Sequence, residues 1–297
     1  MVNTNIRKNM KKTSIITIIL QLLLLFALQR AEAQTIYTRV DSILVERLLE
    51  STKSLPRDAN IPLFFARHFL GRPYVAHTLE VADEEVLVVN TRQLDCTTLV
   101  ENVAALTLCV RRQHYAFSDF LEVLRMLRYR RGELNGYLSR LHYFSDWIID
   151  NASMSLVREH QSPVPPFTAT QYISVNYMSQ HPEAYKALRN NLSLVPLIAR
   201  QEQMLKGKVF RYIPVQEIRN SHVLRDAIHD GDIIAITCNK PGLDIAHLGF
   251  AVWRKDGLHL LNASSVHQKV VEEPMTLRQY MAKHPSFTGI RIVRINR

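Results

Sequence analysis

The sequence lacks the motifs that several common enzyme classes require. It has no glycine-rich phosphate loop, no paired cysteines at zinc-site spacing, no Gly-x-Ser-x-Gly elbow and no cluster of histidines. These absences argue against a P-loop nucleotide hydrolase, a structural zinc domain, an α/β-hydrolase and a histidine-rich metal enzyme. We therefore expect neither a metal nor a cofactor.

Glycine and proline are also scarce, with 9 and 12 occurrences in 297 residues. Apolar residues make up 47% of the chain and charged residues 22%, and no internal repeat is present. This composition excludes a disordered, collagen-like or repetitive chain, and it is typical of one or two packed domains.

The first 33 residues have the order of a secretory signal peptide. A basic start precedes an apolar run at 15–28, and Ala31-Glu32-Ala33 follows as a cleavage site. The run is shorter than the ~20 residues that a membrane-spanning helix needs. We expect cleavage near Gln34 and an exported chain, periplasmic or extracellular, without a transmembrane segment. An uncleaved signal anchor is the alternative.

Charge gives little reason to expect a nucleic-acid partner. Without positions 1–33, the excess of basic over acidic residues falls from 10 to 6, which is mild for a chain of this size. One basic cluster lies on a predicted helix, and we interpret it as a solvated helix face. It consists of Arg125, Arg128, Arg130 and Arg131.

Cysteine occurs three times, as Cys96, Cys109 and Cys238. An odd number in an exported protein leaves at least one thiol unpaired. Cys96 and Cys109 share one predicted helix and would lie about 20 Å apart, too far for a disulfide. A Cys109–Cys238 bridge stays open, and it would leave Cys96 as the free thiol.

Hydrophobic periodicity divides the chain into a helical half and a strand-rich half. It predicts helices over 41–55, 61–69, 96–113 and 118–131, with a short extended run at 85–90. After a proline-rich break at 161–166, Pro182 predicts a further helix start. The strands that the pattern predicts cover 209–213, 232–237, 248–253, 258–261, 269–272 and 290–295. Helices first and strands last indicate an α+β fold.

Cys96 begins one of these helices. Either Asp95 or Thr98 caps the helix, and Thr98 and Glu101 have the spacing of a capping box. Unpaired amides at a helix N-terminus stabilise a thiolate and can bind an oxyanion. Because Asp95 opposes the thiolate, we expect a basic partner. A small buried hydrophobic residue is the alternative role for this cysteine.

His247 is the strongest candidate for that partner among twelve histidines. It opens a strand that quickly becomes apolar, and Gly249 leaves room beside it. A neutral imidazole there could take a proton from Cys96 and return it to a leaving amine.

Asn262 is the candidate for orienting His247, and its place depends on a hairpin turn. If Lys255 and Asp256 form the turn, Asn262 stands opposite Gly249 and diagonal to His247, at a distance that side chains can bridge. If the turn lies one residue later, that contact fails. In the first register Ser264 faces His247 directly and is the reserve choice.

These residues resemble the NlpC-type cell-wall cysteine peptidases. The resemblance rests on Asp95-Cys96 at a helix start, Gly231-Asp232-Ile233-Ile234-Ala235 entering a strand, and His247-Leu248-Gly249-Phe250-Ala251. Four longer segments resemble the exported branch called N-acetylmuramoyl-L-alanine amidase-like. They are residues 94–101, 176–182, 242–244 and 262–265.

The resemblance implies a papain-like core, with a cysteine-bearing helix packed on an antiparallel sheet. It implies a catalytic domain at 91–297, with a helical half at 91–165 and a strand-rich half at 166–297. Residues 34–90 would be a helical addition. The wider superfamily has Ser-Gly after the cysteine, whereas this chain has Thr97-Thr98, which would crowd the cleft and narrow the choice of substrate.

The activity that the resemblance implies is hydrolysis of the amide between N-acetylmuramic acid and L-Ala in peptidoglycan or its fragments. Cys96 would be the nucleophile, His247 the base and Asn262 the orienting residue. A cell-wall endopeptidase and a non-catalytic muropeptide-binding protein of the envelope are the alternatives. Asn176 and Tyr177 could line the cleft, and Asp244 could face an amine or amide of the substrate.

Overall fold

The structure of the protein is a computed structural model that describes residues 35–296. The predicted signal peptide and its cleavage site lie outside the described residues. Within residues 35–296, each helix is too short or too polar to span a bilayer.

Helices dominate the first half of the described chain, as the periodicity predicts. Side-chain caps fix where several of them begin. Thr38 accepts the amide of Asp41 at the start of α2, and Asn60 accepts the amide of Leu63 at the start of α3. The helices of this half are α2 (Arg39–Ser51), α3 (Ile61–His68), α4 (Cys96–Arg111), α5 (Phe117–Arg128) and α6 (Phe144–Ser153).

Strands dominate the second half and form one large antiparallel sheet. Its order is β4-β5-β10-β6-β7-β8-β9, and β3 pairs with β10. These strands are β3 (Val157–His160), β4 (Ala169–Tyr172), β5 (Val209–Pro214), β6 (Ile233–Cys238), β7 (Ile245–Trp253), β8 (Leu258–Ser264), β9 (Lys269–Glu272) and β10 (Phe287–Ile295). The short strands β1 (Thr35–Ile36) and β2 (Leu87–Val88) form a separate pair.

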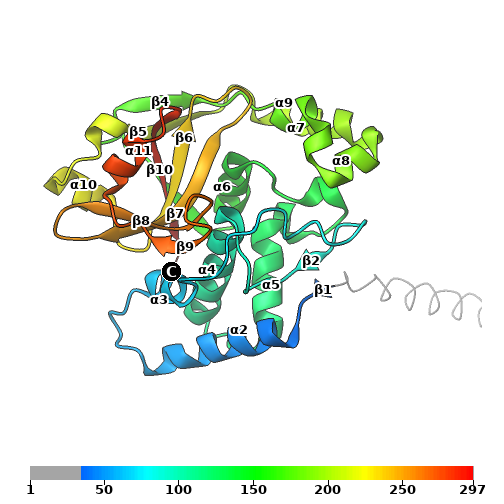
Figure 1. The fold of residues 1–297 in the computed structure, drawn as a ribbon, viewed down its shortest axis with the longest axis horizontal. Coiled ribbons are helices and arrows are strands. Elements are labelled where there is room, and N and C mark those ends of the chain that lie inside the picture. The colour runs from blue at the N-terminus through cyan, green and yellow to red at the C-terminus, as the bar shows by residue number, and fades with distance from the viewer. Residues whose placement is uncertain (1–34, 297) are drawn as a thin grey trace, which may run out of the picture. The chain divides into compact units, whose positions relative to one another are not determined.

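The sheet is covered by helices on both faces (Figure 1). Alternate residues of β7 point to opposite sides, so Phe250 joins the core that holds α4 and α5, whereas Ala251 joins the core beneath α10 (His222–Ala227) and α11 (Leu277–Ala282). A third cluster gathers α7 (Tyr177–Gln180), α8 (Lys186–Asn190) and α9 (Val195–Leu205). The arrangement is α+β with an antiparallel sheet.

The β7–β8 hairpin has the first of the two registers considered above. The backbone amides and carbonyls of Arg254 and Gly257 bond to each other, so Lys255 and Asp256 form the turn. Phe250 pairs with Leu261. The next residues toward the other end of the hairpin are Gly249 and Asn262, which are therefore opposite each other.

Some elements leave no clear periodic signal in the sequence. The helix expected at Pro182 is a single 3-10 turn, and α8 begins only at Lys186. The helices α6 and α9 and the strands β3 and β4 are absent from the prediction. The boundary proposed at residue 90 stays a prediction; side chains of α2, α3 and α4 share one apolar cluster.

The basic cluster, which lies at the end of α5 and in the 3-10 turn after it, differs from the expected solvated face except at Arg131, which is exposed. Arg128 is 2% exposed, and its Nε lies 2.7 Å from the Glu101 carboxylate while its Nη1 donates to the carbonyl of Val88. Arg125 donates to the carbonyl of Gly132, and Arg130 pairs with Asp146. The prediction was wrong because positive charge alone does not reveal a buried anionic partner.

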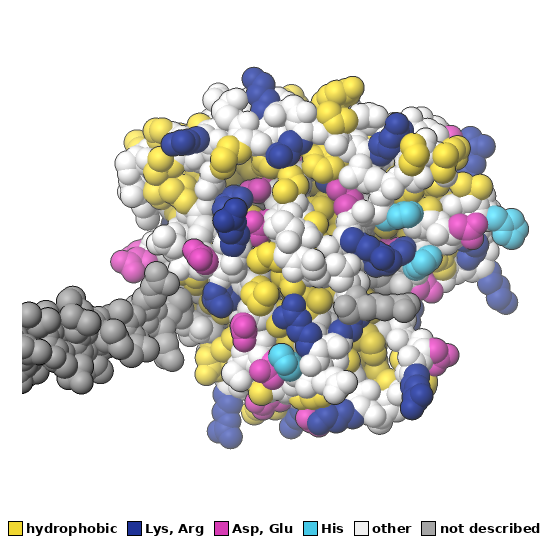
Figure 2. All heavy atoms as spheres, turned by 180° about the vertical axis from the view of Figure 1, so that it is seen from behind, with side chains coloured by type: hydrophobic (Ala, Val, Ile, Leu, Met, Phe, Trp, Pro, Cys, Tyr) yellow, Lys and Arg dark blue, Asp and Glu magenta, His cyan; other side chains and the backbone are white. Residues whose placement is uncertain are grey.

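Glu101 likewise has a different role from the one that its spacing suggests. It pairs with Arg128 and takes no part in a capping box. On the face that Figure 2 shows, Lys and Arg side chains are dispersed among acidic and apolar ones.

The buried pair of Arg128 and Glu101 yields a stability prediction. Arg128→Ala leaves the Glu101 carboxylate buried without its cation, so the free energy of unfolding should fall by about 3–5 kcal/mol. Arg112→Ala removes an exposed arginine at the C-terminal end of α4 and should change it by less than about 0.5 kcal/mol. Urea unfolding at pH 7 measures both. Equal effects for the two variants would contradict a structural role for the pair.

Candidate active site

Asp95 determines that Cys96 is the first residue of α4. Its carboxylate accepts the amide of Thr98 at 2.7 Å, and the Thr98 hydroxyl accepts the amide of Asp95 at 2.9 Å. The capping box therefore joins Asp95 to Thr98, and the expected box between Thr98 and Glu101 is wrong. Thr98 is buried in this role, and Thr97 is the threonine that forms a hydrogen bond with the Cys96 thiol.

The helix N-terminus does not make Cys96 a resting thiolate. Burial, followed by the charge of Asp95, raises the pKa of the Cys96 thiol to about 12, although hydrogen bonds with the Leu248 backbone and with Thr97 act in the opposite direction. The sequence led us to expect a lowered thiol pKa. The cost of burying a charge exceeds the benefit of the helix terminus, so the resting thiol is protonated.

His247 lies on β7 next to Leu248, the residue whose backbone contacts the Cys96 sulfur. The charge of Asp95, the neighbour of Cys96 in the chain, also acts on His247, so the start of α4 lies close to the imidazole. Burial lowers the pKa of His247, while a hydrogen bond with Asn262 and the charge of Glu273 oppose that shift. The resting pair is therefore a neutral thiol and a neutral imidazole.

Asn262 lies on β8 and contacts His247 as the first hairpin register requires. Its Oδ1 is 2.9 Å from His247 Nε2. Ser264, the reserve choice, instead accepts the amide of His267 in the turn after β8. The structure thus joins His247 to Asn262 by a hydrogen bond, with Asp95 and the start of α4 close by.

Two tyrosines and one glutamate near this group were missed by the sequence analysis. Burial and the charges of Cys96 and Asp95 raise the pKa of Tyr74, and burial with the charges of Glu273 and Cys96 raises that of Tyr280 to about 12. Glu273 is fully buried, and its Oε1 accepts from Asn262 Nδ2 at 3.1 Å. No periodic pattern marks these residues, because they come from a loop, from α11 and from the end of β9.

Asp244 is buried at the start of α6 and caps that helix. It is 3% exposed, and its carboxylate accepts the amide of Ser145 at 2.7 Å at the start of α6. This anion at a helix N-terminus stabilises α6. We therefore read Asp244 as a capping residue in place of the substrate contact that the sequence suggests.

Asn176 and Tyr177 lie at the start of α7, beside the loop that precedes β7. Their amides both donate to the carbonyl of Gly242, and Gly242 is five residues before His247. Asn176 is exposed and Tyr177 half-buried. Both remain candidates for contact with a substrate.

The other cysteines and possible metal ligands do not form a second centre. Cys109 and Cys238 are both free, so the bridge that the sequence left open does not form. Among residues 35–296, no three side chains of His, Cys, Asp or Glu are grouped so that they could hold a metal ion.

Solved structures similar to this chain include proteins from Bacteroides. A Bacteroides uniformis N-acetylmuramoyl-L-alanine amidase is 40% identical, with a TM-score of 0.75, and the match covers 80% of this chain and 100% of that one. A Bacteroides fragilis protein described as a candidate xylanase is 42% identical, with a TM-score of 0.73 over 78% of this chain and 99% of that one.

A more distant structure shares the fold alone. It is the Legionella pneumophila protein LPG0564, which is 22% identical, with a TM-score of 0.67 over 86% of this chain and 94% of that one. No curated protein matches the sequence. The family model described as N-acetylmuramoyl-L-alanine amidase-like matches residues 64–290, and the chain therefore belongs to the N-acetylmuramoyl-L-alanine amidase-like family.

Proposed function

We propose that this protein is a cysteine-dependent amidase that hydrolyses the amide between N-acetylmuramic acid and L-Ala of peptidoglycan or its fragments. The observation that supports the proposal is the hydrogen bond between His247 and Asn262 close to the start of α4, where Cys96 lies, in a chain whose family and 40%-identical relative are named for this amidase. In this interpretation the core is papain-like and belongs to the NlpC-type superfamily.

The first step is acylation of Cys96. As the sulfur attacks the lactyl carbonyl carbon, its proton passes to His247, because both groups are neutral before the attack. The C–N bond then breaks, and the imidazolium returns the proton to the departing amine of L-Ala. The products of this step are a thioester on Cys96 and a free peptide.

The second step is hydrolysis of the thioester. Water loses a proton to His247 as it attacks the acyl carbon, and the imidazolium returns that proton to the Cys96 sulfur when the C–S bond breaks. The free muramic acid carboxyl group leaves, and the neutral pair is restored. The whole cycle needs only water and substrate.

Two groups are available to stabilise the oxyanion of each tetrahedral intermediate. One is the backbone amide of Cys96 at the first position of α4, where helix amides lack intrahelical acceptors. The other is the hydroxyl of Tyr74, which lies close enough to Cys96 for the two groups to interact electrostatically.

The carboxylates near the site do not favour cleavage of a sugar chain. Glycosidases use one carboxyl group as an acid and a second as a base or nucleophile. Here Asp95 is engaged by the Thr98 amide, and Glu273 is fully buried behind Asn262. Neither carboxylate is free to approach a glycosidic bond, so amide hydrolysis fits these residues better.

Substrate recognition and location follow from the same proposal. Asn176 and Tyr177, held beside the loop before β7, are the proposed substrate contacts. Thr97 beside the sulfur leaves less room than the small residue of the wider superfamily. We also propose that the protein acts outside the cytoplasm after removal of the segment 1–33.

The nucleophile and the bond can be tested together. N-acetylmuramoyl-L-Ala-D-isoGln incubated with the protein should release L-Ala-D-isoGln, and Cys96→Ala should release none, whereas Cys109→Ala should stay within about twofold of the wild type. Mass spectrometry of the products measures this. Sugar that still carries L-Ala after digestion of a longer stem peptide would indicate an endopeptidase, and loss of activity in a folded Cys109→Ala variant would exclude Cys96 as the sole essential thiol.

The neutral resting pair gives a distinctive pH dependence. Burial holds the pKa of His247 below its usual 6.5 and raises that of Cys96 to about 12. Activity therefore needs neutral His247, and kcat/KM should fall only as the pH drops below 6.5 and the imidazole takes up a proton. It should stay level up to roughly pH 9. A decline between pH 7.5 and about 9, while circular dichroism shows a folded protein, would indicate a thiolate–imidazolium pair instead.

A further inference from the structure

We propose that Glu273 is a positioning residue, which fixes the amide orientation of Asn262 and through it the tautomer of His247. The inference rests on the proposed function for its catalytic meaning. The tautomer of His247, which the inference predicts, can be measured without any substrate.

Glu273 is an unusual residue to find at 0% exposure, because burying a carboxylate is costly unless hydrogen-bond donors surround it. Two side chains supply such donors. Its Oε1 lies 3.1 Å from Asn262 Nδ2, and its Oε2 lies 3.2 Å from Nε2 of His267. The buried carboxylate of Glu273 thus contacts Asn262, which in turn contacts His247, the candidate base.

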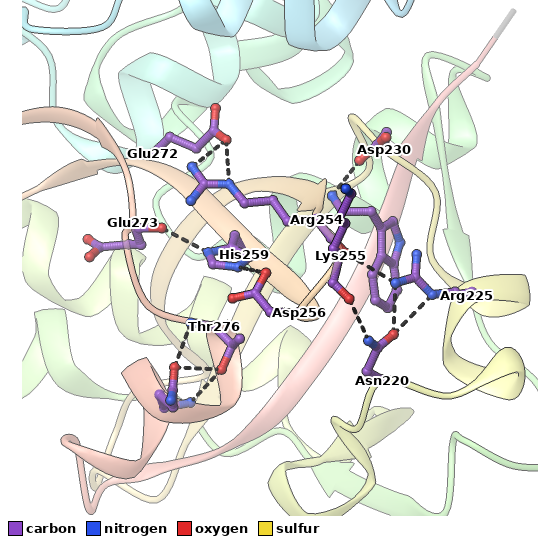
Figure 3. Close-up of polar contacts among 12 residues, drawn as sticks. Asn220, Arg225, Asp230, Arg254, Lys255, Asp256, His259, Glu272, Glu273 and Thr276 are labelled. Atoms are coloured by element: carbon purple, nitrogen blue, oxygen red, sulfur yellow. Dashed lines mark hydrogen bonds and ion pairs between the residues drawn. The ribbon is translucent and has the colours of Figure 1, made fainter.

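The backbone of Glu273 is held as firmly as its side chain. Its amide donates to the carbonyl of Leu260 at 2.8 Å, and its own carbonyl accepts from His259 Nδ1 at 2.9 Å. Figure 3 shows that the other ring nitrogen of His259 contacts Asp256 in the hairpin turn, with 3.0 Å between Nε2 and the carboxylate. The turn that sets the β7–β8 register therefore also supports Glu273.

A carboxylate determines which way the neighbouring amide points. An ionised carboxylate can only accept hydrogen bonds, whereas an asparagine amide has one accepting and one donating end. Asn262 must direct its NH₂ group to Glu273, and its Oδ1 is then the atom that faces His247. An aliphatic side chain at position 273 would remove this constraint and leave the amide free to turn over.

The amide in turn determines the tautomer of the imidazole. Because Oδ1 only accepts, Nε2 of His247 must carry its proton, and Nδ1 keeps a lone pair. Nδ1 is therefore the nitrogen that can take the Cys96 proton. A reversed amide would present NH₂ to Nε2 and favour the tautomer with a protonated Nδ1, which cannot act as the base.

Glu273 also contributes through its charge when the reaction begins. The imidazole becomes an imidazolium as Cys96 attacks, and a carboxylate two hydrogen bonds away stabilises that positive charge. Glutamine at this position would keep an acceptor for Asn262 but lose the charge. Leucine would lose both, and a comparison of the two variants separates orientation from charge.

The test is ¹⁵N NMR of the imidazoles in histidine-labelled protein, with His247→Gln to identify the signals of His247. The wild type should show the Nε2–H tautomer. Glu273→Leu should shift the population toward Nδ1–H, while Glu273→Gln should keep Nε2–H. Glu272→Gln is the matched control, since the neighbouring Glu272 pairs with Arg254 and Arg67, and it should leave the tautomer unchanged.

Turnover of the same variants gives the second measurement. Glu273→Leu should lower kcat by roughly 10- to 100-fold, in the range expected for residues that orient a ligating or catalytic histidine, with KM within about twofold of the wild type. Glu273→Gln should lower kcat by a smaller factor than Glu273→Leu. Glu272→Gln should keep the wild-type kcat.

Two results would overturn the proposal. One is a wild-type spectrum with His247 protonated at Nδ1, which depends on no substitution at position 273. The other is an unchanged His247 tautomer in folded Glu273→Leu. A protein that gives the expected spectra but cleaves no muramoyl amide would overturn the proposed function and leave the positioning role of Glu273 intact.

Discussion

The site depends on one contact between the helical and the strand-rich halves of the fold, where the start of α4 meets the backbone of β7 at Leu248. Asp95 fixes the first turn of the helix, so the sulfur of Cys96 has one place to lie. The side chains of α4 then pack against the apolar face of β7 and β8. A small displacement of the helix along the sheet would separate the sulfur from His247 and leave both halves otherwise intact.

Burial at this contact gives the two reacting groups matched protonation states. A charged pair would be costly at these half-buried positions, so the thiol keeps its proton and the imidazole stays neutral. In the mechanism that we propose, the proton transfer is then part of bond formation. The fold therefore positions two neutral groups and orients their hydrogen bonds. It does not have to stabilise a thiolate–imidazolium ion pair during the time between turnovers.

The sequence predicted the α+β class, most of the large strands, Cys96 at a helix start and, in one of two hairpin registers, the contact of Asn262 with His247, because periodicity, a helix-capping aspartate and the spacing within one hairpin are local properties. It left two turn positions open for the hairpin, and only the structure selects the one that pairs Asn262 with His247. Arg128 and Glu101 were misread, and the capping role of Asp244 was missed, for a common reason. Each is a charged residue whose partner lies 27 or more positions away in the sequence, and no local pattern encodes such a partner.

The same limit explains why Glu273 and Tyr74 went unnoticed. Glu273 follows a short edge strand, next to the more exposed Glu272, and nothing in the two residues' local sequence tells one from the other. Their difference arises because successive side chains of an extended chain point to opposite sides. Glu273 therefore contacts Asn262, whereas Glu272 contacts Arg254.

The two-residue turn at Lys255 and Asp256 has a consequence for how this protein can change over evolutionary time. Surface turns usually tolerate insertions, but one added residue here would move every later side chain of β8 to the opposite face of the sheet. Asn262 would then leave His247, although the turn itself lies at the far end of the hairpin from the thiol. The length of this exposed turn thus determines whether Asn262 can contact His247, and evolutionary change there should be confined to substitutions that keep the number of residues.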